Sequence, residues 1–268
     1  MLRVLTLNIW NLNHWADRRT EIVTWIDQLR PDVVALQEVV RNNEDGRCQS
    51  TWLAERTGLT DVFAKGMDIG SVEFGVGLLS RFPIMGSETK ELTSGDEPPE
   101  GRVVLRADLE TTRGLLPVFV THLNWMFHHG HVREAQVLET ADFVLARPES
   151  DNPALLMGDF NAEPDSDEIR FLKGLHSMNG RSFYMQDAYE VSHAPMPGYT
   201  WDNRNPFAAA TREPDRRIDY IFVTTMRKDG RGTIHDCRIV FDRPGADGAF
   251  ASDHFGVLAD VQITPGGS

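Results

Sequence analysis

The sequence predicts an α/β (α+β) fold, and two features of the chain support that class. Near the amino terminus, two short apolar runs at residues 2–7 and 32–36 flank residues 18–29, where apolar side chains recur at helical spacing. Further along, apolar runs of strand length alternate with turn-rich segments and one long helical segment. With 268 residues, 41% hydrophobic and 25% charged, the chain has a globular composition, and we expect a single domain over residues 1–268.

A strand, helix, strand unit is expected to open the fold. The first strand ends at Asn8, and the helix over residues 18–29 is stopped by Pro31. The nearly continuous apolar run at residues 32–36 is typical of a strand buried on both faces. We expect this strand to end with Gln37 and Glu38.

The rest of the chain predicts more strands than helices. Strands are expected at residues 75–80, 84–92, 102–109 and 117–121 in the middle of the chain, and at 154–157, 218–223, 234–240 and 255–263 after it. Residues 132–146 predict a long helix that Pro148 ends. Asp165 is expected to cap a short helix that runs through Leu172.

The acidic balance of the chain argues against non-specific binding to nucleic acid. Forty acidic and 27 basic residues give a formal net charge of −13, which repels polyanions at long range. A few of the acids can still serve a divalent cation, because Mg²⁺ prefers carboxylate oxygens.

Neither a targeting segment nor a membrane span is expected. Residues 1–10 lack the apolar stretch and cleavage site of a signal peptide, and no run reaches the roughly 18 to 20 apolar residues of a membrane helix. Cys48 and Cys237 lack the spacing of a disulfide framework or a zinc site. A cytoplasmic location is the default expectation.

Polar residues fall at or just past the ends of the apolar strands, where sheets present their chemistry. Each of them alone is more often a turn former or a satisfied neighbour of a strand than a site residue, so only the set indicates a site. The set is Asn8, Glu38, His122, Asp159, Asn161, Asp219, Asp253 and His254.

Six ordered segments resemble the endonuclease/exonuclease/phosphatase superfamily and span nearly the whole chain. They are Thr6-Leu7-Asn8-Ile9-Trp10, Leu36-Gln37-Glu38-Val39, Thr121-His122-Leu123, Gly158-Asp159-Phe160-Asn161, Arg217-Ile218-Asp219-Tyr220-Ile221 and Ser252-Asp253-His254. The resemblance implies a four-layer sandwich of two packed mixed β-sheets flanked by helices. It also implies a metal-dependent phosphoric ester hydrolase. The residue pattern alone supports mixed strands and helices, but not the order of the strands.

The resemblance also implies a metal site. Glu38 matches the main Mg²⁺ ligand of the superfamily, Asn8 matches an asparagine beside the metal, and Asp253 resembles a further acidic ligand. Mn²⁺ is an alternative ion. Whether one or two metals bind during turnover stays open.

The catalytic residues follow from the same resemblance. Asp159 and Asn161 resemble the pair that orients the attacking water and supports the phosphoryl oxygens. Asp219 and His254 resemble a buried couple in which the carboxylate orients the imidazole. His122 matches a histidine that some branches place against a non-bridging phosphate oxygen. The resemblance leaves open whether His254 or Asp159 takes the proton of the water.

The substrate is less well defined by the sequence. Arg102 fits a position that supports the site, and Tyr199 or Trp201 can stack on a substrate, in a segment similar to sphingomyelinase-like and uncharacterised bacterial members. Residues 124–127 form either an apolar lip for a lipid or aromatic group or a segment buried beneath the loop.

The leading hypothesis is hydrolysis of a small or lipid-like phosphoester by in-line attack of water. No cluster of Lys and Arg interleaved with aromatic residues resembles the DNA-clasping loops of the DNA endonuclease branch. A DNA endonuclease or exonuclease is therefore the second hypothesis, and a catalytically silent binding module is the third. The sequence leaves open whether the enzyme is a diesterase or a monoesterase. It also leaves open peripheral lipid contact and the oligomeric state.

Overall fold

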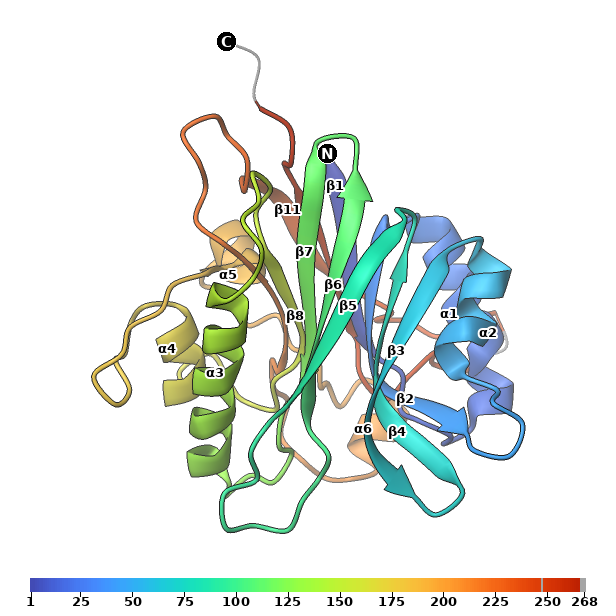
Figure 1. The fold of residues 1–268 in the computed structure, drawn as a ribbon. Helices are drawn as coiled ribbons and strands as arrows, with labels where there is room; N and C mark the ends of the chain where they lie inside the picture. Colours follow the sequence, from blue (N-terminus) through green and yellow to red (C-terminus); the bar gives the residue numbers. More distant parts are fainter. Residues whose placement is uncertain (247, 266–268) are drawn as a thin grey trace.

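The computed structural model describes residues 1–246 and 248–265. Two six-stranded β-sheets pack against each other, and helices cover their outer faces, with α1 and α2 on one side and α3 and α4 on the other (Figure 1). The four-layer α/β sandwich implied by the sequence resemblance is therefore confirmed. Residues 247 and 266–268 of the expected single domain lie outside the described part.

The first sheet has the strand order β11-β12-β1-β2-β4-β3. Its strands are β1 (Leu2–Asn8), β2 (Val33–Asn42), β3 (Thr60–Ile69), β4 (Val72–Ser80), β11 (Ile234–Val240) and β12 (Gly256–Val261). Strands β1 and β2 are parallel and are joined by α1 (Trp15–Leu29), so the expected strand, helix, strand unit is confirmed. The sequence did not predict α2 (Gln49–Thr57) or β3.

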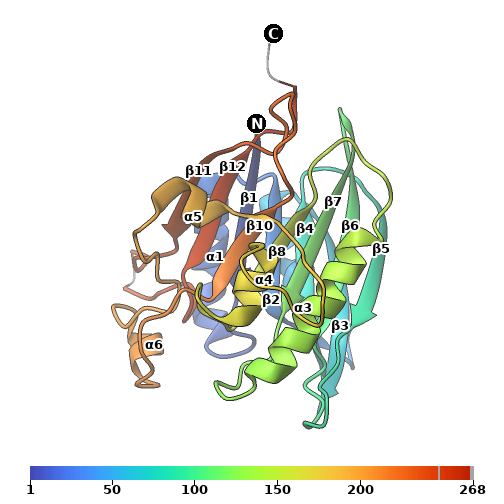
Figure 2. The same ribbon diagram turned by 90° about the vertical axis from the view of Figure 1, so that its left-hand side faces the viewer.

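The second sheet has the strand order β5-β6-β7-β8-β10-β9. Its strands are β5 (Ile84–Glu91), β6 (Val103–Thr111), β7 (Gly114–His122), β8 (Leu155–Asp159), β9 (Gln186–Asp187) and β10 (Asp219–Val223). Strands β7 and β8 are its parallel pair, and α3 (Gly130–Leu145) connects them. Three short helices, α4 (Asp167–Leu172), α5 (Ala188–His193) and α6 (Pro206–Ala209), complete the fold, and Figure 2 shows α4 beside α3.

Two local expectations were wrong. Strand β2 does not end at Glu38 but continues to Asn42. Its register with β4 shifts between Leu36 and Val39, and the pairing with β4 then resumes. The cap of α4 is Ser166 rather than Asp165, since Ser166 is the extended residue directly before the helix.

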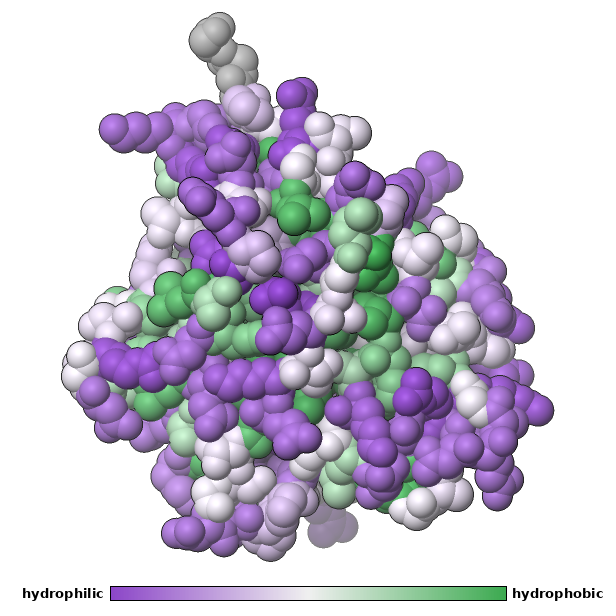
Figure 3. All heavy atoms as spheres, in the orientation of Figure 1, coloured by the Kyte–Doolittle hydropathy of each residue, from purple (hydrophilic) through white to green (hydrophobic). Residues whose placement is uncertain are grey.

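Three apolar clusters hold the layers together. Val4, Val118 and Met157 belong to the cluster between the two sheets, while separate clusters lie under α1 and α2 and under α3 and α4. Hydrophilic side chains cover most of the face seen in Figure 3, with apolar ones in small groups between them. In the part of the chain that the structure describes, no helix has both the length and the apolar character needed to cross a membrane.

Candidate active site

Strand register brings three predicted site residues into one row of the second sheet. His122 at the end of β7 pairs with Asp159 at the end of β8, and Asp159 pairs on its other side with Asp219 at the start of β10. Gly158 permits this close pairing, because a Cβ at that position would lie 2.0 Å from the carbonyl oxygen of Thr121. The row therefore depends on the registers of β7, β8 and β10.

The first sheet contributes a second group of residues from the ends of other strands. Asn8 ends β1 opposite Gln37 of β2, and Glu38 takes a left-handed backbone conformation (φ 59°) within the irregular part of β2. The hydroxyl of Ser252 donates to the carbonyl oxygen of Asn8 at 2.6 Å, which ties the segment carrying Asp253 to the end of β1. Left-handed conformations of non-glycine residues are strained and are concentrated at functional sites.

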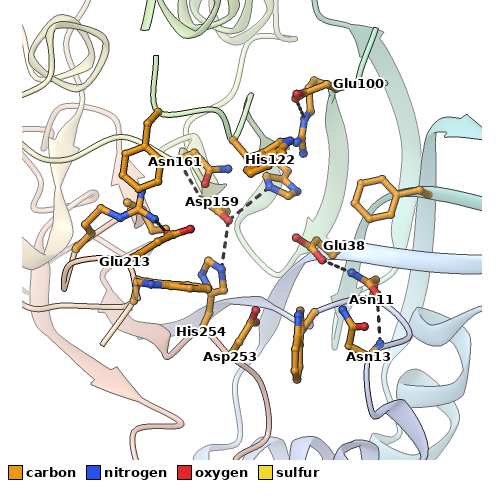
Figure 4. A pocket seen from close by; sticks show the side chains of 18 of the residues that line it. Asn11, Asn13, Glu38, Glu100, His122, Asp159, Asn161, Glu213, Asp253 and His254 are labelled. Carbon is orange, nitrogen blue, oxygen red and sulfur yellow. Dashed lines mark hydrogen bonds and ion pairs between the residues drawn. The ribbon is translucent and has the colours of Figure 1, made fainter. Parts of the chain in front are cut away.

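Residues of both groups line one cleft of about 660 Å³ at the end of the sandwich, whereas Asn8 and Asp219 are buried behind its lining. The β3–β4 hairpin, the segment between β5 and β6, and α6 all lie at this end, which is the lower end in Figure 1. Figure 4 shows Asp159 in the middle of the cleft, with His122, Asn161 and His254 around it and Glu38 farther to one side. Of the predicted site residues, the cleft is lined by Glu38, Arg102, His122, Asp159, Asn161, Trp201, Asp253 and His254.

An asparagine bridges the two carboxylates that come from different sheets. The amide nitrogen of Asn8 donates to Glu38 Oε1 at 3.3 Å and to Asp159 Oδ2 at 3.0 Å. Asn11 donates to the other oxygen of Glu38 at 2.7 Å. Because an uncharged amide adds no charge, it can hold two acids close together without further repulsion.

Asp219 and His254 form the predicted buried couple. The imidazole Nδ1 of His254 lies 2.9 Å from Asp219 Oδ2, and its Nε2 lies 3.8 Å from Asp159 Oδ2. Burial disfavours the charged ring, but the carboxylates of Asp219 and Asp159 outweigh it and raise the pKa of His254 to about 10. At neutral pH His254 is therefore an imidazolium directed at the centre of the cleft.

Burial shifts the pKa values of Asp159 and His122 in opposite directions, in each case toward the neutral form. Burial and the nearby charge of Asp219 raise the pKa of Asp159 to about 6, against the opposing effects of His254 and Asn8. Burial, with smaller contributions from Arg102 and His254, holds the pKa of His122 well below its usual value. His122 Nε2 lies 3.5 Å from Asp159 Oδ2, so a neutral imidazole faces the carboxylate.

The oxygen donors beside Glu38 suit a hard divalent cation. Burial raises the pKa of Asp253 to about 7, and the charge of Glu38 adds to this shift while His254 opposes it. A cation bound between Glu38 and Asp253 would relieve the repulsion between their two carboxylates. Carboxylate and amide oxygens are also the donors that Mg²⁺ prefers. Asp159, Asp219 and His254 also bring three ligand atoms within 4.8 Å of one another, but a protonated His254 repels a cation. The carboxylates of Glu38 and Asp253 are the better match, with Asn8 beside them, because the amide nitrogen of Asn8 holds Glu38 and its oxygen accepts from the backbone N–H of Trp10 at 2.9 Å.

A sequence model of the endonuclease/exonuclease/phosphatase family matches residues 5–254. The chain belongs to this family. No curated protein is similar enough in sequence to match it. The members of this family are hydrolases that act on phosphoester bonds, and they depend on metal ions.

Several solved structures share the fold. TDP2 from D. rerio, complexed with single strand DNA product, is 22% identical with a TM-score of 0.74, over 96% of this chain and 97% of that chain. A functionally unknown conserved protein from Enterococcus faecalis V583 is 20% identical with a TM-score of 0.74, over 98% and 100%. A family protein from Bacteroides vulgatus is 21% identical with a TM-score of 0.73, over 98% and 99%. At these identities the likeness shows the fold alone.

In this family member a buried arginine supports the group of site residues that comes from the first sheet. The guanidinium of Arg18 donates to the carbonyl oxygen of Asn13 at 2.5 Å, to that of Ile9 at 3.0 Å and to that of Ala251 at 2.5 Å. These carbonyls belong to the loops that follow Asn8 and precede Asp253. Arg18 is fully buried, so the two loops are held by one internal cation.

Helix α3 supports the loop on the opposite side of the cleft. Arg133 is buried, pairs with Glu168 at 2.6 Å and donates to the carbonyl oxygen of Met126 at 2.7 Å. The side chain of Gln136 accepts from the backbone N–H of Asn124 at 2.9 Å. Arg133 is therefore a buried support of the loop and not a surface charge of the helix.

The loop after β7 forms the lip of the cleft. Trp125 and Phe127 both line it and are 50% and 53% exposed. Of the two alternatives for residues 124–127, the apolar lip is therefore the one that the structure has. Tyr199 is 38% exposed but does not belong to the lining, whereas Trp201 does.

Among the lining residues that the sequence did not predict, four pair through their side chains with another residue of the lining. Asn11 follows Asn8 in the same loop, Glu100 stands two residues before Arg102, and Glu213 and Arg216 precede the block at Asp219. Their closeness to recognised motifs is the only signal that the sequence offers. None of the four follows a predicted strand directly, so the strand-end argument passed over them.

Proposed function

We propose that this protein is a Mg²⁺-dependent hydrolase that cleaves a small-molecule or lipid-like phosphoester by in-line attack of water. The observation that carries the proposal is the position of Asp159, which accepts from Asn8 at 3.0 Å and lies 3.5 Å from His122 and 3.8 Å from His254. Water activation and stabilisation of the phosphoryl oxygens both need such a convergence of an acceptor with donors.

In this proposal Glu38 and Asp253 hold the cation and Asn8 supports Glu38 beside it, with Mn²⁺ as an alternative to Mg²⁺. A bound divalent cation supplies positive charge that lowers the barrier to attack on an anionic ester. Glu38 is prepared for this role, because Asn8 and Asn11 each orient one of its carboxylate oxygens.

The second sheet carries the proposed catalytic residues. Asp159 orients the water as a hydrogen-bond acceptor, and the backbone N–H of Asn161 fixes its other oxygen at 2.9 Å. The imidazolium of His254, held by Asp219, faces the negative charge that develops on the phosphoryl group. His122 offers a neutral N–H to a non-bridging oxygen. With His254 protonated, the arrangement favours an ionised Asp159 as the acceptor of the proton from water, and a deprotonated His254 is the alternative acceptor.

The walls of the cleft support a substrate with an apolar part. Met67, Ile69, Trp125 and Phe127 line its rim, and Trp201 lines its interior. Arg102 is buried beside the rim with one guanidinium nitrogen, Nη1, that has no protein partner, so we propose it as a donor to the substrate phosphate. Such a mixture of apolar walls and a few fixed polar groups is typical of small-molecule sites.

The test is hydrolysis of bis-p-nitrophenyl phosphate and of p-nitrophenyl phosphate with Mg²⁺ or Mn²⁺, with EDTA, and with Glu38→Gln. Metal-dependent release of nitrophenolate that the variant lacks, at unchanged melting temperature, is the expected result. The preferred ester separates a diesterase from a monoesterase. Activity that survives both EDTA and Glu38→Gln would contradict the proposal.

A DNA endonuclease or exonuclease is the second candidate, supported by the structural likeness to TDP2 complexed with single strand DNA product. It predicts DNA cleavage and a steep loss of DNA affinity with rising salt. A silent binding module is the third, and it predicts no turnover of any ester. The complete set of Glu38, Asp159, Asn161, Asp219 and His254 speaks against it.

A further inference from the structure

Both arginines that line the cleft are already paired with a glutamate that lines it too. Arg102 Nε donates to Glu100 Oε2 at 3.0 Å, and Arg216 contacts the carboxylate of Glu213. The arginines are buried, while the glutamates stay partly open to the cleft. Figure 4 shows Glu100 and Glu213 on opposite sides of Asp159. Each guanidinium charge is therefore compensated before any substrate binds.

The remaining charges of the described lining are negative in sum. His122 is a neutral imidazole, and the charge of His254 is matched by Asp219 at 2.9 Å. The other ionisable groups of the lining are the acids Glu38, Asp159 and Asp253, so none of them adds a positive charge. The lining of the cleft thus has no surplus positive charge to hold a second phosphate.

The rim offers contact to an uncharged group instead. The guanidinium of Arg216 lies 4.2 Å from the centre of the Phe127 ring, and its Nε is buried without a partner. The exposed side chains of Ile69 and Trp125 stand at the same opening. Placing a phosphate against apolar side chains costs free energy of hydration, whereas an aromatic or aliphatic group gains from that contact.

We infer that Glu100 and Glu213 are specificity-determining residues that restrict the cleft to phosphoesters with one phosphate and an otherwise uncharged organic group. This inference rests on the proposed phosphohydrolase function. Each glutamate neutralises one arginine and repels a further phosphate of the ligand. The specificity therefore comes from weaker binding of polyanionic ligands. The reacting phosphate is the only anion that the cleft accommodates.

The first test compares two esters that differ by one phosphate. They are the p-nitrophenyl ester of thymidine 5′-phosphate and the same ester with an added 3′-phosphate, both assayed with Mg²⁺. We expect the wild type to favour the first by at least about tenfold in kcat/KM. Glu100→Gln and Glu213→Gln should each reduce this preference by roughly three- to tenfold, because each removes one negative charge near the ligand. Gln can still accept a hydrogen bond from the arginine.

Glu88→Gln is the matched control. Glu88 on β5 pairs with Arg106 at 3.1 Å and does not line the cleft, so its removal changes the net charge equally without changing the preference. A wild type that hydrolyses the 3′-phosphorylated ester equally well or better would overturn the inference. So would an unchanged preference in both cleft variants.

A binding measurement separates this inference from the proposed function. The fluorescence anisotropy of a fluorescein-labelled ten-nucleotide DNA strand is measured in EDTA, where metal-dependent turnover plays no part. Glu100→Gln and Glu213→Gln should lower the Kd at least about threefold relative to Glu88→Gln. Equal affinities in all variants would overturn the inference, even if the esters are hydrolysed. Absence of ester hydrolysis together with the expected affinities would count against the proposed function alone.

Discussion

Replacement of Asp219 by Asn tests whether this carboxylate acts through His254. Asp219 Oδ2 lies 2.9 Å from His254 Nδ1, both side chains are buried, and Asp219 Oδ1 has no partner. Asn keeps the shape and can accept the same hydrogen bond, but it lacks the negative charge. The substitution therefore removes charge with little change of geometry.

The magnitude follows from the separation of the two charges. Opposite charges about 4 Å apart attract by about 4 kcal/mol at an effective dielectric constant of about 20. If the imidazolium stabilises the transition state, loss of this support corresponds to as much as about 10³-fold in rate, at about 1.4 kcal/mol for each factor of ten. Because the amide dipole of Asn retains part of the support, we expect kcat to fall about 10²- to 10³-fold.

The assay is kcat for bis-p-nitrophenyl phosphate with saturating Mg²⁺, measured for the wild type, Asp219→Asn, His254→Ala and the double variant. Residues that act as a unit give strongly non-additive effects. Asp219→Asn should then change the rate of His254→Ala by less than about threefold. An equal loss in both backgrounds would refute the reasoning, and so would a single variant that keeps more than a tenth of wild-type kcat.

Three further predictions concern stability. Arg18→Met should lower the free energy of unfolding by about 3 kcal/mol or more in urea titration, because buried carbonyls of both site loops lose their donor; a loss below about 1 kcal/mol would contradict this. Since burial lowers the pKa of His122, the unfolded state binds more protons than the folded state below about pH 6.5, and stability falls as the pH falls. His122→Asn should remove up to about 1.4 kcal/mol of the loss measured between pH 7.5 and 5.5, and an unchanged acid sensitivity would argue against it. Gly158→Ala should cost about 3 kcal/mol because its Cβ would meet the Thr121 carbonyl at 2.0 Å, whereas Gly86→Ala, with open space at its Cβ, serves as the control and should be near neutral.

The sequence by itself determined the element types of most of the chain. Apolar periodicity predicted the first unit, the helix over 132–146 and the strands of the second sheet other than the short β9, because these patterns reflect which face each element buries. It also placed Asn8, His122 and Asp159 at strand ends, where the structure has them. The resemblance supplied the four-layer arrangement, which periodicity does not encode.

Tertiary structure alone decided which side chains meet. The contact of Asn8 with Asp159 joins two sheets across 151 positions of sequence, and it depends on how those sheets pack. The contact of Arg216 with the Phe127 ring likewise requires the loop after β7 to fold over the cleft. Local patterns report burial and turns, whereas charge balance in a cleft depends on residues from many elements at once. For that reason the sequence indicated the chemistry of the site, and only the fold indicates which charges the site can accept.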